Sequence, residues 1–169
     1  MVARFSVLRR PGRARARSRD QRGAVVVEFA LIVPLLLLLV FGILEFGYMM
    51  SRDTAIDNAA RDGARVASLD GTFSDVCTAV KSELSGSGIP APTTCNASAS
   101  TTTANIKIDC IKADGSACAA SSTTFDTLSV SGATATVRVS YSYKWITPLI
   151  SSLFGSTASL DQYTQMRVE

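Results

Sequence analysis

A carboxylate inside an apolar stretch is the first feature of this sequence that could do chemistry. Glu28 follows Gly23 by five residues and alone interrupts an apolar run from Ala24 to Leu44. A carboxylate at depth in a bilayer costs on the order of a few kcal/mol when nothing compensates it. If a protease cut the chain after Gly23, the new ammonium group of Ala24 on a neighbouring copy could neutralise Glu28.

The arginines that precede this run allow a simpler interpretation of Glu28, which stays open beside the first. Residues 1–22 carry a net charge of +7 and the rest of the chain −4, and the positive charges are Arg4, Arg9, Arg10, Arg13, Arg15, Arg17, Arg19 and Arg22. Glu28 could lie in the interfacial zone, where its side chain reaches out of the lipid. Because basic flanks of a membrane segment stay inside, we predict a cytoplasmic N-terminus. The apolar run that follows at once argues against nucleic acid as a partner.

The apolar run is long enough to cross a bilayer. Its 21 residues match the roughly 20 that a spanning helix needs, whereas the apolar core of a signal peptide has only about 7–15 residues. We therefore predict a single-pass protein of the cell membrane, in contact with lipid. Its parts are a basic leader, a transmembrane helix, an amphipathic continuation of that helix and an extracytoplasmic domain, with boundaries at 1–23, 24–50, 51–70 and 71–169.

Small residues along the helix indicate close packing. Pro34 should bend the span, and Gly42 and Gly47 leave room for a neighbouring helix. Further on, small side chains recur every four residues and form a smooth stripe of Ala55, Ala59, Gly63 and Ala67. The stripe could pack against the chain's own domain or against an identical helix of another subunit, and the sequence leaves both possibilities open.

Two groups of residues mark the outer part of this helix. Glu45, Tyr48 and Arg52 offer an aromatic ring and charges to lipid headgroups at the outer boundary of the span. The turn Asp70-Gly71-Thr72 stops the helix, with Gly71 suited to a cap or a turn.

The remaining residues predict a small α+β domain with an antiparallel sheet. Apolar residues at helical spacing indicate a short second helix over 73–85. Alternating apolar residues indicate strands, and we expect them at 102–111, 126–145 and 157–168. A Gly/Ser/Ala-rich connection at 113–124 separates the first two, and a short apolar turn or helix at 146–154 separates the last two.

Four cysteines lie on the far side of the span from the arginines, where disulfides persist. Four cysteines allow three pairings, and we prefer Cys77 with Cys95 and Cys110 with Cys118. Zinc is disfavoured because the sequence has no Cys-x-x-Cys pair and no histidine.

The absence of histidine also removes the commonest general base. Serine and cysteine catalysis would both lack a partner for the nucleophile. We therefore expect neither an enzyme nor a cofactor.

The N-terminal half of the chain resembles the TadE-like pseudopilins of the tight-adherence (Flp) pilus machinery. In that family the N-terminus reads roughly Gly, four apolar residues, then Glu-Phe or Glu-Tyr. The strong resemblance covers about residues 22–69, and the matching positions are Gly23, Glu28, Phe29, Ala30-Leu31, Pro34, Gly42, Glu45-Phe46-Gly47 and Ala59-Ala60-Arg61-Asp62-Gly63-Ala64-Arg65. The end of the chain, Met166-Arg167-Val168-Glu169, also resembles the family's C-terminus.

This resemblance implies a pilin-like precursor that a prepilin peptidase, a membrane aspartyl protease, cuts between Gly23 and Ala24. Glu28 and Phe29 would then serve recognition and assembly, and other pilin or pseudopilin subunits would be partners through helix packing. The major pilin of that system is very short, whereas about 100 residues follow the helix here. A minor, pseudopilin-like component for assembly or export of Flp pili is therefore the function that the resemblance implies.

A second hypothesis comes from another class of protein. The chain could be an uncleaved, signal-anchored surface protein whose outer domain binds a ligand or partner. The two hypotheses differ in the mature N-terminus and in the effect of replacing Glu28.

Overall fold

The computed structural model describes residues 20–98, 100–118, 122–128 and 131–169. Two compact units make up the chain, one ending at Val40 and one beginning at Phe41. The first unit contributes the N-terminal part of one helix. The second holds the rest of that helix and an α+β domain with a three-stranded antiparallel sheet, so the predicted fold class is confirmed.

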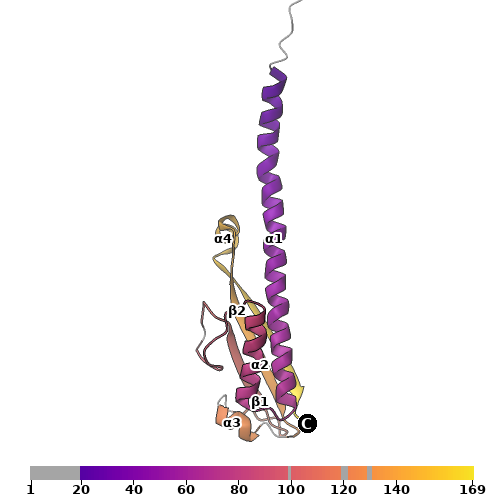
Figure 1. Cartoon of the computed structure of the whole chain (residues 1–169), viewed down its shortest axis with the longest axis vertical. Helices are drawn as coiled ribbons and strands as arrows, with labels where there is room; N and C mark the ends of the chain where they lie inside the picture. The colour runs from indigo at the N-terminus through magenta and orange to yellow at the C-terminus, as the bar shows by residue number, and fades with distance from the viewer. Residues whose placement is uncertain (1–19, 99, 119–121, 129–130) are drawn as a thin grey trace, which may run out of the picture. The chain divides into compact units, whose positions relative to one another are not determined.

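The long helix α1 runs from Asp20 to Ser68 and continues through Pro34 (Figure 1). Its end is a tight cap in which the amide of Gly71 donates to the carbonyl of Val66 at 3.1 Å, with Asp70 in the left-handed region at φ 58°. This is the bonding pattern of a Schellman motif. A Cβ on residue 71 would lie 2.5 Å from the Val66 oxygen, so glycine is required there by close approach of the backbone.

The second helix, α2, spans Phe73–Gly86 and confirms the predicted helix at 73–85. Thr72 and Asp75 form a capping box at its start: the Asp75 amide donates to the Thr72 hydroxyl at 3.2 Å, and the Thr72 amide donates to the Asp75 carboxylate at 3.1 Å. These bonds satisfy two amides that a helix start leaves free. Val76, Val80 and Leu84 form its buried face.

The sheet has the order β1-β2-β3, with β1 at Asn105–Ile111, β2 at Thr134–Lys144 and β3 at Thr157–Arg167. Alternate residues are buried on one face, as period-2 patterns require, and the fully buried ones include Ile106, Ile108, Val137 and Val139. All three predicted strands exist. The middle one starts at residue 134 and not at 126, because a helix occupies part of the predicted range.

That helix, α3, spans Ser122–Leu128, where a connection and then a strand were predicted, so that part of the prediction is wrong. Phe125 is buried and meets the ring of Phe73 edge-on, with centroids 6.1 Å apart. Asp126 accepts a hydrogen bond from the Phe73 amide at 2.6 Å. The short helix is therefore fixed by the start of α2. The other short helix, α4 at Pro148–Phe154, confirms the apolar turn or helix predicted for 146–154.

The core lies between the C-terminal half of α1, helix α2 and the sheet. Helix α1 contributes Ile56, Ala59, Ala60, Ala64 and Ala67, all wholly buried. Figure 1 shows α2 alongside this half of α1. The end of the chain closes the domain, since Val168 is buried and the Glu169 amide donates to the Ser68 carbonyl at 3.1 Å.

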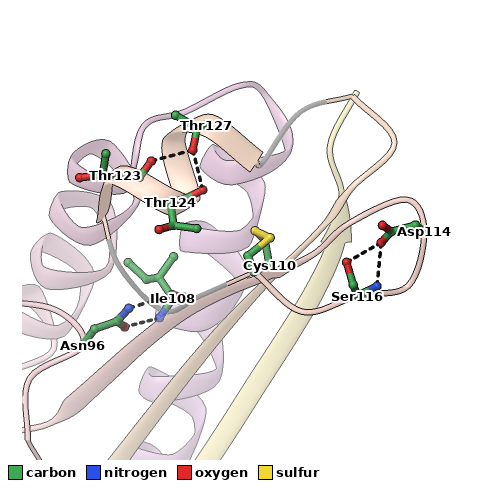
Figure 2. The surroundings of a disulfide bond; sticks show 9 residues. Asn96, Ile108, Cys110, Asp114, Ser116, Thr123, Thr124 and Thr127 are labelled. Carbon is green, nitrogen blue, oxygen red and sulfur yellow. Dashed lines mark hydrogen bonds between the residues drawn. A yellow bond between two sulfur atoms is a disulfide. The ribbon is translucent and has the colours of Figure 1, made fainter.

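Two disulfides cross-link the domain, and they join the same cysteine pairs that were predicted from the sequence. Cys77 on α2 is bonded to Cys95, and Cys110 on β1 is bonded to Cys118. The surroundings of the second bridge are drawn in Figure 2. There the Asn96 side chain lies along the outer edge of β1, donating to the Ile108 carbonyl at 2.9 Å and accepting from its amide at 2.7 Å (Figure 2). Backbone groups of an edge strand are in this way covered.

Candidate functional site

Among the described residues, one helix is long and apolar enough to cross a membrane, and the most apolar part of it is wholly unburied. Its large side chains are exposed along the whole run, for example Val26 at 66% and Leu31 at 74%. An apolar surface this continuous needs a partner outside the chain, and lipid fits it in length and chemistry.

The predicted processing residues lie at the beginning of this surface. Gly23 and Ala24 are exposed and fall within the first turns of α1, which starts at Asp20.

Glu28 and Phe29 follow one turn later and are also exposed, Phe29 at 68%. No ion pair or hydrogen bond reaches the Glu28 carboxylate from any residue that the structure describes. Among the described residues the carboxylate is therefore without a partner, and most of the leader arginines lie outside the described residues. An external partner and the interfacial zone next to those arginines remain the two possibilities that the sequence raised.

The small residues of α1 separate into two groups. Ala59, Gly63 and Ala67 are buried in the domain, and Ala55 is half-buried. A Cβ on Gly63 would lie 2.4 Å from Val80 Cγ2 and 3.2 Å from Val137 Cγ1. This stripe thus packs against the chain's own α2 and β2.

By contrast, Gly42 and Gly47 have nothing within 4 Å of an added Cβ, and Pro34 is exposed. These residues remain available to a neighbouring helix or to lipid.

A second carboxylate, Glu45, has the opposite environment to Glu28. Only 3% of it is exposed, and it accepts four hydrogen bonds from the end of β2 and the loop that follows. Tyr143 Oη lies 2.8 Å and the Ile146 amide 2.7 Å from Oε1, while the Thr147 amide lies 3.1 Å and its hydroxyl 3.2 Å from Oε2. The prediction that Glu45 faces headgroups is therefore wrong, because the domain provides donors for all of its charge.

Aromatic rings surround this carboxylate. Tyr143 contacts Tyr48 and Trp145, with ring centroids 6.0 and 5.5 Å away. Burial, and then the hydrogen bond and charge of Glu45, raise the pKa of the Tyr143 phenol, so that it stays protonated and can donate. Arg52 lies over the Tyr48 ring and donates to its hydroxyl and to the Ser87 carbonyl.

From the sequence alone, only the glutamate of this site could be recognised as unusual, and its hydrogen-bond donors could not be identified. Glu45 breaks an apolar pattern, which marks it as unusual, but its donors lie 98 to 102 residues further along the chain. Among the described residues, no group of three or more His, Cys, Asp and Glu side chains could hold a metal ion. The hydrogen bonds of Glu45 therefore have a structural role, because they attach the loop after β2 to helix α1.

Comparison with known proteins gives one match. No curated protein and no solved structure matches the chain. The model of one protein family, described as TadE-like protein, matches residues 23–65. That segment begins at the predicted cleavage glycine, includes both carboxylates and ends at the last arginine of the alanine-rich block. The resemblance suggested by the sequence is thereby confirmed: over residues 23–65 the chain matches the TadE-like protein family.

Proposed function

We propose that this chain is a pseudopilin-like structural subunit that acts in the assembly or export of Tad-type (Flp) pili. The observation that carries the proposal is the match to the TadE-like family over residues 23–65, which spans the unburied apolar helix and its exposed carboxylate. The family resemblance implies a structural and not an enzymatic role. Pilin and pseudopilin subunits, membrane lipid and a prepilin peptidase are the proposed partners.

The exposed Glu28 supports assembly through the helix. A carboxylate without a partner among the described residues of its own chain would be neutralised by the ammonium group that cleavage creates at Ala24 of an adjacent copy. Such a contact would favour one stagger between neighbouring helices, because other staggers leave the charge in lipid.

The charges and the disulfides support one orientation. Eight arginines precede the span, which favours a cytoplasmic N-terminus. Two disulfides follow it, and disulfides persist in oxidising compartments. Both features lead to a single-pass protein with its domain outside the cytoplasm.

Cleavage is tested by the intact mass of the protein purified from its native membrane. We expect a chain that begins at Ala24. Gly23→Val should accumulate as precursor, whereas the matched variant Gly42→Val should still be cut, since neither added side chain meets another residue of the chain within 4 Å of its Cβ. An intact N-terminus in the wild-type protein would instead support the uncleaved surface anchor.

Assembly is tested at Glu28 in a strain that lacks the native gene. Glu28→Gln should be processed and inserted but should not restore piliation, and Glu28→Asp should restore part of it because the charge is kept. Normal piliation with Glu28→Gln would contradict the proposed contact with a neighbouring Ala24.

A further inference from the structure

An apolar groove lies between helix α1 and the loop that carries α4. It has a volume of about 320 Å³ and is lined by Gly42, Glu45, Phe46, Trp145, Ile150 and Phe154. Nearly all of the surface that it exposes is apolar. Phe154 is 74% exposed, Ile146 65% and Phe46 59%. Large side chains this exposed, gathered around one groove, indicate a surface that is covered by something other than water.

The loop side of this groove is free of charge, and the charged residue that lines the helix side, Glu45, is only 3% exposed. No charged residue occurs between Lys144 and Asp161. On the other wall, Gly42 belongs to the end of the apolar run of α1, and Phe46 lies two residues after that run ends at Leu44. Both walls of the groove are therefore largely apolar.

Glu45 fixes the level of the loop along the helix. Its carboxylate accepts from the amides of Ile146 and Thr147 at 2.7 and 3.1 Å, and Thr147 directly precedes α4. The loop is thus bound to α1 one residue after the apolar run ends at Leu44. A bilayer boundary at this height would meet both elements together.

Trp145 has the surroundings of an interfacial tryptophan. Its Nε1 is buried and has no hydrogen-bond partner among the described residues. Tryptophan is enriched where a membrane meets water, because its ring prefers an apolar medium and its N–H needs an acceptor.

A cationic rim borders the same loop. A second cavity of about 430 Å³ is lined by Tyr48, Arg52, Tyr143, Lys144 and Ile146 among others. Ile146 lines this cavity, and Trp145, its neighbour in the chain, lines the groove. Apolar side chains flanked by Arg and Lys match the acyl and phosphate parts of a phospholipid.

From these features we propose that residues 145–154 are a second membrane contact. Its exposed apolar side chains, Ile146 and Phe154, insert into the boundary between headgroups and acyl chains of the leaflet at the C-terminal end of the α1 span, and they hold the domain against the bilayer. The occupant of the groove is phospholipid. The inference rests on the membrane span in the proposed function but not on cleavage or pilus assembly.

Trp145 itself reports on this contact, because it is the only tryptophan of the chain. The full-length protein is placed in lipid nanodiscs, one chain per disc, made either from ordinary phosphatidylcholine and phosphatidylglycerol or from the same lipids with bromine near the top of the acyl chains. We expect lower Trp145 fluorescence in the brominated discs and weak quenching by iodide in the water. Lipids brominated near the chain ends should quench less.

The double variant Ile146→Ser and Phe154→Ser removes two exposed side chains and should lose most of the quenching by bromine. Tyr163→Ser is the matched control, since Tyr163 is also exposed, at 58%, but lies on the sheet. It should keep the wild-type quenching.

Three outcomes would overturn the inference. If the protein enters the discs but Trp145 fluoresces equally in both lipids, residues 145–154 do not contact the bilayer, and the proposed membrane span is unaffected. Fluorescence that changes only when two chains share a disc would assign the groove to a second copy. A chain that does not incorporate into the discs would contradict both the membrane span and the proposed contact of residues 145–154.

Discussion

At the scale of residues, the two glutamates of α1, Glu28 and Glu45, have opposite surroundings within the same helix. Glu28 is exposed, and Glu45 is 3% exposed with four donors around it. Hydrogen bonds to a charged acceptor are worth more than neutral ones, and leaving a buried donor unpaired costs more again. Glu45 is therefore a structural residue, and Glu28 is the one with charge to offer another molecule.

We predict that Tyr143→Phe lowers the unfolding free energy by about 1–2 kcal/mol, because Glu45 loses one of its donors. Glu45→Ala should cost more, since it leaves the amides of Ile146 and Thr147 without their acceptor. Near-ultraviolet circular dichroism of the purified protein in detergent measures both during heating. The control is Tyr163→Phe, an exposed tyrosine on the sheet, which should stay within about 0.5 kcal/mol of wild type. Equal effects of the two Tyr→Phe variants would contradict the assigned role of Tyr143.

Glycines of α1 should respond to a methyl group in opposite directions. Gly63→Ala should destabilise by about 1–3 kcal/mol, because the added carbon would lie 2.4 Å from Val80 Cγ2. Gly47→Ala meets nothing within 4 Å and should stabilise by up to about 1 kcal/mol through helix propensity. The same melting experiment compares them. A tolerated Gly63→Ala would show that α1 and α2 are packed less closely than the structure has them.

At the scale of elements, the helices and strands with strong periodic patterns could be predicted, and the short ones without such a pattern could not. Helix α1, helix α2 and strand β1 follow from apolar spacing. Helix α3 consists of Ser122–Leu128 in a Ser/Thr-rich region and is fixed by contacts of Phe125 and Asp126 with the start of α2, which no local pattern encodes. The donors of Glu45 could not be predicted for the same reason, because they come from a distant part of the chain.

The capping box of α2 was not predicted, although Thr72 and Asp75 have the spacing that such a box requires. The Thr72 side chain, and then its backbone amide, lower the pKa of Asp75 by hydrogen bonding. A lowered pKa contributes stability above the unfolded value near 3.8, and that contribution is lost as the pH falls through the folded value.

Thr72→Ala should therefore cost about 1 kcal/mol at neutral pH, and the difference from wild type should shrink in acid as Asp75 becomes protonated. Thermal unfolding at neutral pH and at pH values below the unfolded pKa of Asp75 measures this. Thr102→Ala is the control, a threonine outside regular structure. A difference that grows in acid would contradict the assigned bonds.

At the scale of the whole molecule, the disulfides and the arginines predict the same topology from independent physics. Orientation is checked on intact cells with a membrane-impermeant maleimide. The four cysteines should be unreactive before reduction, because both pairs are bonded, and the half-buried Cys77 and Cys95 should react from outside after reduction. A cysteine placed in the leader, Ser18→Cys, should be reactive in the precursor only after the cells are opened. Labelling of Ser18→Cys from outside would reverse the topology.

The attachments of the domain to α1 determine how a mechanical load would pass through the subunit. Glu45 binds the loop before α4, Asp53 accepts from Gln162 on β3 at 3.0 Å, and the Ser68 carbonyl binds the last residue, Glu169. These points are spread along 24 residues of helix, a length of roughly 36 Å at about 1.5 Å per residue. A force that draws the helix along its axis would therefore be shared as shear among several separated attachments. Such loading resists detachment better than peeling from one end, so a machine that extracts the helix would carry the folded domain with it.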